Sequence, residues 1–158
     1  MNSGGDKQPF VSIITLNYNQ VSVTAAFLES ARTLLYTNFE ILVCDMGSDT
    51  DPSETLSIAN YPNTRLLRSP VNLGFSGGNN WGMSQATGEF LFIVNNDTEL
   101  TPDIIGRLLA PFTADPAIAV VCPKIKYFFD RHTIQYAGFR PMTPFTARTY
   151  SIGENEPR

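Results

Sequence analysis

The chain has 158 residues, of which 42% are hydrophobic and 16% charged, and this composition predicts one globular domain with a core of its own. The net charge is −4 and no dense run of Lys and Arg occurs, which argues against a nucleic-acid-binding protein. The polar, glycine-rich residues 1–8 lack the apolar stretch of a signal peptide or membrane anchor, so we expect a disordered leader there and no transmembrane segment.

Beyond the leader, apolar β-rich runs alternate with segments of helical periodicity. This pattern is typical of βαβ units, and it predicts an α/β domain with a mixed, mainly parallel sheet and helices on both faces. Strands are predicted at residues 10–16, 39–44, 64–68 and 90–94, and helices at residues 21–35, 52–59, 76–86 and 103–114. Weaker strand patterns follow at residues 118–122, 125–129 and 133–139. The folded domain is expected to span residues 9–139, with an irregular, proline-containing tail at residues 140–158.

Two cysteines, Cys44 and Cys122, lie in apolar, strand-like runs. Buried thiols are typical of such positions, and neither residue has the spacing of a metal ligand. We therefore expect two buried free thiols in a reducing compartment rather than a disulfide.

The strongest candidate for chemistry is Asp97. Residues 90–94 are five apolar residues in a row, which predicts a central strand covered on both faces, and the chain then runs through Asn95 and Asn96 into Asp97. The carboxyl ends of strands are where open α/β sheets bind ligands. A carboxylate there can hold Mg²⁺ or Mn²⁺ together with substrate phosphates, although it can equally cap the turn that follows the strand.

A second polar segment follows the strand at residues 39–44. Asp45 and the loop after it could accept hydrogen bonds from a base or ribose, but the same composition suits an Asx turn followed by a helix N-cap. Tyr18, at the end of the first strand, could stack on a nucleobase or simply cover the end of the sheet, and the sequence favours neither.

Residues 72–82 are rich in glycine but match neither of the common phosphate-binding motifs. They lack the Lys-Ser/Thr ending of a P-loop and the glycine spacing of a dinucleotide fingerprint. The glycines permit a close backbone approach to a ligand or a sharp turn into a helix. Phe75 and Trp81 are expected in the core.

These polar blocks follow one another in a specific order. They are Asn17-Tyr18-Asn19, Asp45 with Gly47-Ser48, the glycine-rich residues 72–82, residues 86–89, and Asn95-Asn96-Asp97-Thr98. In this order and spacing, residues 10–122 closely resemble the family 2 glycosyltransferases of the GT-A fold, and among them the rhamnosyltransferase-like bacterial enzymes.

The resemblance implies an inverting enzyme that passes a hexosyl or rhamnosyl group from a nucleoside-diphosphate sugar, dTDP-rhamnose or a UDP-sugar, to a glycan or lipid-linked acceptor in cell-envelope polysaccharide synthesis. It implies a divalent metal, Mg²⁺ or Mn²⁺, on Asp97, with Asn95 in the first acidic place of the Asp-X-Asp motif. Tyr18 would pack near the nucleobase and Asp45 would accept its imide N–H. The implied donor-binding residues are Asn17, Tyr18, Asp45, Ser48, Asn72, Gly74, Gly78, Asn79, Asn80, Asn95, Asn96 and Asp97.

The chain also departs from the family pattern. Met46 stands where the family often has Asp or Asn, and no Glu-Asp pair follows Asp97 to supply a catalytic base. The chain is therefore expected to be the amino-terminal, donor-binding half of a longer enzyme, poorly active or inactive alone. It is expected to be cytoplasmic, and membrane-peripheral as part of the full-length protein. Exposed aromatic residues could make it self-associate; the candidates are Phe128, Phe129, Tyr136 and Phe139.

Two alternatives from other classes stay open. A sugar- or nucleotide-binding module without catalysis would explain the missing base. A nucleotidyltransferase shares the strand-and-carboxylate geometry, but it would normally carry a basic, glycine-rich loop after the first strand. Residues 17–20 contain no Lys or Arg.

Overall fold

A computed structural model of the chain describes residues 8–141, 143 and 149–157. It divides into two compact units, residues 1–104 and 105–158, each of which is described by itself. All but the last residue of the expected leader lie outside the described ranges. Within those ranges, no helix is long and apolar enough to cross a membrane.

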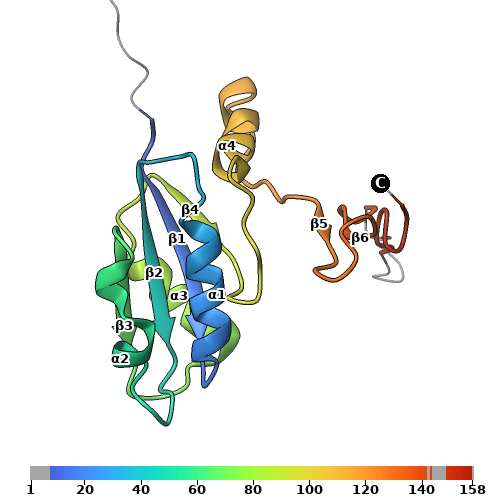
Figure 1. Cartoon of the computed structure of the whole chain (residues 1–158). Helices are drawn as coiled ribbons and strands as arrows, with labels where there is room; N and C mark the ends of the chain where they lie inside the picture. The colour runs from blue at the N-terminus through green and yellow to red at the C-terminus, as the bar shows by residue number, and fades with distance from the viewer. Residues whose placement is uncertain (1–7, 142, 144–148, 158) are drawn as a thin grey trace, which may run out of the picture. The chain divides into compact units, whose positions relative to one another are not determined.

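The first unit is a parallel four-stranded sheet with helices on both faces (Figure 1). Its strands are β1 (Val11–Asn17), β2 (Phe39–Asp45), β3 (Thr64–Arg68) and β4 (Phe90–Ile93), in the order β3-β2-β1-β4. Its helices are α1 (Val21–Ala31), α2 (Ser53–Leu56), the 3-10 turn η1 (Ile58–Asn60) and α3 (Gly74–Gln85). Every neighbouring pair of strands is parallel, which confirms the predicted α/β class.

The two faces of the sheet are set by the alternation of side chains along β1 and β2. Even-numbered residues such as Ile14, Leu42 and Cys44 form a buried cluster on the face that α3 covers. In Figure 1, α3 lies behind the sheet and α1 in front of it. Glycines let α3 pack closely, because a Cβ atom at Gly82 would lie 2.6 Å from Cγ2 of Ile14. One part of the core therefore lies between α3 and the central strands, and α1 adds its own buried residues, Phe27 and Leu28.

Several predicted boundaries in this unit are corrected. β4 is at an edge of the sheet rather than in its centre, and Leu91 and Ile93 are each 45% exposed. The prediction of a central strand was wrong because an unbroken apolar run cannot reveal how many neighbours a strand has. Helix α1 ends at Ala31, four residues early, and Leu35 is exposed. Helix α3 begins at Gly74, so most of the expected glycine-rich loop is helical.

At the amino-terminal edge of the sheet, Glu40 holds β1, β2, β3 and the turn before β4 together. Its carboxylate accepts hydrogen bonds from Ser12 Oγ at 2.7 Å and from the backbone N–H of Thr87 at 3.0 Å. It also pairs with the guanidinium of Arg65 at 3.1 Å. Burial acts to raise the pKa of Glu40, but hydrogen bonds from Ser12, Thr87 and Arg65 outweigh it, so the pKa lies below its usual value.

Replacing Glu40 by Gln is expected to lower the free energy of unfolding at pH 7 by about 1–3 kcal/mol, because hydrogen bonds to a charged acceptor are lost. The folded-state pKa lies below the unfolded value of about 4.3, so this contribution is complete above that range and disappears as the pH falls through the folded-state pKa. Urea unfolding at neutral and acid pH measures both effects. The exposed Glu54→Gln is the matched control. If the free energy of unfolding depends on pH in Glu40→Gln as it does in the wild type, this account is contradicted.

The second unit contains α4 (Ile104–Ala114), whose first residue ends the first unit, and a two-stranded antiparallel sheet of β5 (Ile125–Lys126) and β6 (Ile134–Tyr136). The strand predicted at residues 118–122 does not form. Residues in the expected tail pair with the β6 region, since Ser151 bridges Phe139 and Ala137 N–H donates to the carbonyl oxygen of Ile152.

One of the two cysteine predictions is wrong. Cys44 is fully buried, and burial raises the pKa of its thiol to about 11, as expected for an inert core residue. Cys122 is exposed, because the segment around it is not part of a sheet. Of the aromatic residues named above, Phe128, Phe129 and Phe139 are exposed, and the self-association that they would favour stays a prediction.

Candidate functional site

The carboxyl ends of three parallel strands bring the predicted polar segments together. Asn17, the last residue of β1, is the register partner of Asp45, the last residue of β2. β4 runs parallel to β1, so Asn95-Asn96-Asp97 emerge at the same edge, as predicted. β1 lies between β2 and β4, at the place where the order of the sheet reverses, and open α/β sheets bind ligands at such a place.

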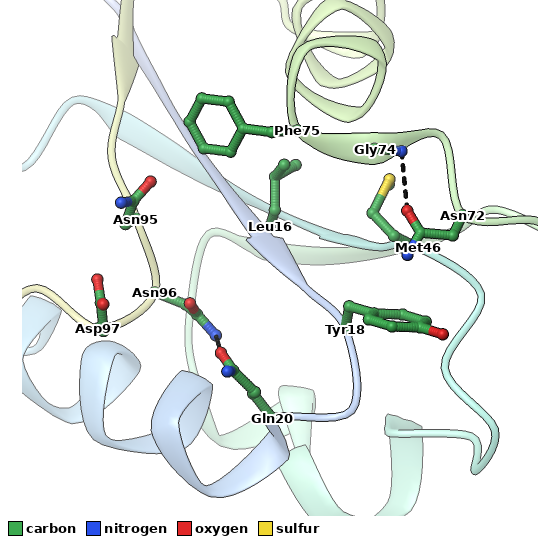
Figure 2. A pocket seen from close by; sticks show the side chains of 10 residues that line it. All are labelled: Leu16, Tyr18, Gln20, Met46, Asn72, Gly74, Phe75, Asn95, Asn96 and Asp97. Carbon is green, nitrogen blue, oxygen red and sulfur yellow. Dashed lines mark hydrogen bonds between the residues drawn. The ribbon is translucent and has the colours of Figure 1, made fainter.

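An open cleft of about 370 Å³ lies at this edge of the sheet. Its lining residues are Leu16, Tyr18, Gln20, Met46, Asn72, Gly74, Phe75, Asn95, Asn96 and Asp97. Figure 2 shows Asn95 and Asp97 on one side, Tyr18 and Asn72 on the other, and Leu16 between them. The amino-terminal end of α3 opens on the cleft through Gly74 and Phe75. A helix amino terminus favours negative charge, so this end of the cleft suits an anion.

The cleft combines aromatic, apolar and polar surfaces. Tyr18 is 47% exposed and Phe75 is 65% exposed, so both rings are accessible to a ligand. Met46 is 2% exposed and contributes an apolar part of the lining. Among these described lining residues, Asp97 is the single carboxylate, and neither Lys nor Arg occurs. Such a lining suits a molecule with a flat, partly apolar end and a hydrogen-bonding end.

Behind the cleft, Asp45 is the centre of a buried polar cluster. Its Oδ1 accepts a hydrogen bond from Asn17 Nδ2 at 2.7 Å, and its Oδ2 accepts one from the backbone N–H of Ser48 at 3.2 Å. The guanidinium of Arg68 lies 3.3 Å from the same oxygen. Asp45 is 0% exposed, so these partners take the place of water. The cluster fixes the ends of β1 and β2 and the loop after β2.

The comparisons with known proteins agree with this geometry. The model of the family described as Glycosyl transferase family 2 matches residues 12–157. The chain belongs to that family.

Among its relatives is protein y4gI of Sinorhizobium fredii, which is 34% identical over 136 residues, covering 82% of this chain and 14% of that protein. A chondroitin synthase of Escherichia coli is 30% identical over 115 residues, covering 72% of this chain and 17% of that protein. This family 2 chain thus spans less than a fifth of the length of these two relatives.

A solved structure confirms the fold. The mannosyltransferase PcManGT of Pyrobaculum calidifontis, determined in complex with GDP-Man and Mn²⁺, superimposes with a TM-score of 0.64 at 22% identity. The match covers 72% of this chain and 34% of that chain. The first unit therefore has the GT-A fold that the resemblance implied. The finer assignment to rhamnosyltransferase-like enzymes stays a prediction.

Half of the predicted donor-binding residues line the cleft. They are Tyr18, Asn72, Gly74, Asn95, Asn96 and Asp97. The others lie elsewhere: Asn17 and Asp45 in the buried cluster, Ser48 in that cluster and beside a smaller hollow, and Gly78, Asn79 and Asn80 along α3. Contact of this second set with a donor stays a prediction.

Four of the lining residues were not among the predicted donor-binding residues, and these are Leu16, Gln20, Met46 and Phe75. Met46 was noted only as a departure from the family pattern, and Phe75 was wrongly expected in the core. A signal for Phe75 was present, since it follows Gly74 at the start of α3, where the first helical turn faces the carboxyl edge of the sheet.

The residues of the cleft fit a divalent cation that also binds phosphate. No group of three or more His, Cys, Asp or Glu side chains gathers in the described part of the chain. Mg²⁺ and Mn²⁺ sites in phosphate-binding enzymes typically use one or two carboxylates plus substrate oxygens. Asp97 is exposed, and the Asn95 side chain lies on the same side of the cleft (Figure 2). One carboxylate and one amide oxygen are therefore available.

Proposed function

We propose that this chain is the donor-binding part of an inverting glycosyltransferase that takes a hexosyl or rhamnosyl group from a nucleoside-diphosphate sugar. The observation that carries the proposal is the cleft itself, with exposed Asp97 on one side and exposed Tyr18 on the other. Membership of family 2 supports the reaction type. The relatives' names, such as chondroitin synthase, support a glycan or lipid-linked acceptor in polysaccharide synthesis, with a cytoplasmic location as the accompanying prediction.

The cleft separates the two ends of such a donor. Tyr18 offers aromatic surface for a nucleobase, and Met46 on the same side of the cleft offers apolar lining (Figure 2). The diphosphate would lie toward Asn95 and Asp97, where side-chain oxygens can share a cation with it. Because no described lining residue is Lys or Arg, a cation is needed to offset the charges of Asp97 and the diphosphate.

The residues of this chain would act mainly by binding and orienting the donor. Asp97 and Asn95 would hold Mg²⁺ or Mn²⁺, which supplies charge stabilisation for the departing diphosphate. Tyr18 and Asn72 would fix the nucleoside, so that the anomeric carbon faces the acceptor. The amino terminus of α3 would add a favourable potential for negative charge.

A binding module without catalysis of its own is a second candidate, favoured by one observation. Apart from Asp97, no described residue that lines the cleft is a His, Asp, Glu, Lys or Cys that could serve as a general base. We therefore expect this chain alone to bind donor and to transfer sugar poorly, since loss of a general base typically costs about 10²- to 10⁴-fold in rate.

Calorimetry with UDP-GlcNAc, GDP-mannose and dTDP-rhamnose, each with and without Mn²⁺, tests the proposal. At least one donor should bind, and Mn²⁺ should tighten that binding. Transfer of the sugar to a glycan acceptor, with release of the nucleoside diphosphate, should be slow or undetectable. Absence of binding by all three donors would refute the donor-binding role, and rapid transfer would refute the assignment to a binding half.

A further inference from the structure

We propose that the buried hydroxyl of Thr24, on α1, is a positioning group that couples the two sides of the cleft. The inference rests on the proposed donor-binding function and assigns a role to a residue that does not itself line the cleft. Thr24 is 0% exposed and lies in the first turns of α1. It contacts one buried residue from each side of the site.

Thr24 links two side chains that lie far apart in sequence, Asn17 and Asn96. Thr24 Oγ1 donates a hydrogen bond to Asn17 Oδ1 at 2.8 Å. It accepts one from Asn96 Nδ2 at 2.9 Å. A hydroxyl has one donor and two acceptor sites, so these two bonds use its donor and one acceptor. Thr24 and Asn17 are 0% exposed and Asn96 is 9% exposed, so loss of either bond leaves a buried polar group without that partner.

The chain of hydrogen bonds has a defined direction and ends on a charge. Asn96 donates to Thr24, Thr24 donates to Asn17, and Asn17 donates to the carboxylate of Asp45. A bond to an ionised acceptor is stronger than one between neutral groups, and it polarises the bonds before it. Asp45 is itself held by the guanidinium of Arg68. The loop after β4 is thereby tied to the buried cluster around Asp45.

The two asparagines that Thr24 holds are each next to residues that face the cleft. Asn96 is 9% exposed, whereas Asn95 and Asp97 on either side of it are exposed and line the cleft. Asn17 is 0% exposed and precedes Tyr18, which lines the opposite side. Anchoring the buried residue in each segment thus fixes where its neighbours point. Thr24 would set the spacing between the metal-binding side and the base-binding side.

Two further contacts attach the loop after β4 on either side of this link. The backbone N–H of Val94 donates to the carbonyl of Ile14, and that of Leu100 donates to Ser30 Oγ at 3.1 Å. Between these two points, Asn96 reaches Thr24, with a longer contact of 3.4 Å to Gln20. Removing the Thr24 hydroxyl should therefore loosen residues 95–98 while leaving both ends of the loop attached.

The experiment compares Thr24→Val, which removes the hydroxyl at nearly constant shape, with Thr24→Ser, which keeps it. Thr15→Val is the matched control, because Thr15 is also 0% exposed and its Oγ1 has no hydrogen-bond partner among the described residues. In the ligand-free protein, Thr24→Val should raise amide hydrogen exchange at residues 95–98 by about tenfold or more relative to the rest of the sheet. Thr24→Ser and Thr15→Val should exchange like the wild type.

A second measurement asks whether the link matters to binding. The dissociation constants of UDP, GDP and dTDP are measured with and without Mn²⁺, and the tightening by Mn²⁺ is compared between variants. Loss of a group that orients a metal ligand typically lowers metal affinity about 10- to 100-fold. The factor by which Mn²⁺ tightens nucleotide binding should therefore be about 10- to 100-fold smaller in Thr24→Val than in the wild type. Thr24→Ser should restore it. A residue that only stabilised the fold would lower the unfolding temperature without changing this ratio.

The outcomes are separable. If the wild type binds none of the three nucleotides, the proposed function fails, and the exchange measurement still decides the role of Thr24. If exchange in Thr24→Val is unchanged at residues 95–98, or rises equally throughout the sheet, the positioning role is refuted. If Thr24→Val does not fold, Asn96→Ala cuts the same link from the loop side and should raise exchange at the same residues.

Discussion

Replacing Asp97 by Asn is expected to remove the Mn²⁺-dependent part of nucleotide-sugar binding, with a loss of affinity of about 100-fold or more. The charge of this carboxylate is the single negative protein charge among the described residues that line the cleft. Changes beside a metal ligand already cost about 10- to 100-fold, and loss of a ligand should cost at least as much. Binding measured without Mn²⁺ should change little or improve, because repulsion between Asp97 and the diphosphate is then removed.

The same substitution should leave the stability of the protein nearly unchanged. Asp97 is exposed, and surface substitutions of this kind are usually within about 0.5 kcal/mol. Calorimetry with Mn²⁺ and thermal unfolding measure the two effects separately. Glu89→Gln, at the amino-terminal edge of the same sheet, is the control for the change in net charge. Asn95→Asp adds a second carboxylate and should tighten Mn²⁺ binding. Equal Mn²⁺ dependence in the wild type and Asp97→Asn would overturn the metal-binding assignment.

The sequence predicted the parallel sheet and the edge where its polar segments meet, for a physical reason. β1 and β2 are short apolar runs that each end in a polar residue, and parallel strands deliver such residues to one edge. Strand neighbours could not be predicted in the same way. The apolar residues of β4 resemble those of a central strand, yet Leu91 and Ile93 are half-exposed at an edge. Propensity alone also misplaced a strand at residues 118–122, where no pairing partner is present in the described chain.

The sequence also could not predict which of the site residues are buried and which are accessible. Asn17 and Tyr18 are adjacent, but one is fully buried and the other is 47% exposed. Likewise Asn96 is buried between two exposed neighbours. Whether a polar residue at a strand end holds the scaffold or faces a ligand depends on a partner in another element, which is Thr24 on α1 for Asn96 and Asp45 on β2 for Asn17. Such partners become visible only when the elements are placed against one another.

The second large expected effect is a loss of folding stability when Asp45 is replaced by Asn. Asp45→Asn would present an amide N–H to a site that now contains the donors of Asn17, Ser48 and Arg68. Breaking a buried, hydrogen-bonded charge pair costs about 3–5 kcal/mol, and because Arg68 is partly exposed we expect the lower end, about 3 kcal/mol. Urea unfolding measures the loss. Asp49→Asn, an exposed carboxylate in the same loop, should cost much less.

Nucleotide binding by Asp45→Asn then distinguishes two roles of Asp45. One is support of the buried cluster, and the other is the contact with the base that the family resemblance implied. Uracil carries an imide N–H from which Asp45 could accept a hydrogen bond, whereas cytosine has a hydrogen-bond acceptor at the same ring position. If Asp45 acts only through Asn17 and the cluster behind the cleft, the variant should lose affinity for UDP and CDP by the same factor, measured at a temperature where it is folded. A loss confined to UDP, with stability unchanged, would instead show that Asp45 reads the base. The geometry favours the first result, because the carboxylate is 0% exposed and both of its oxygens already accept hydrogen bonds from the protein.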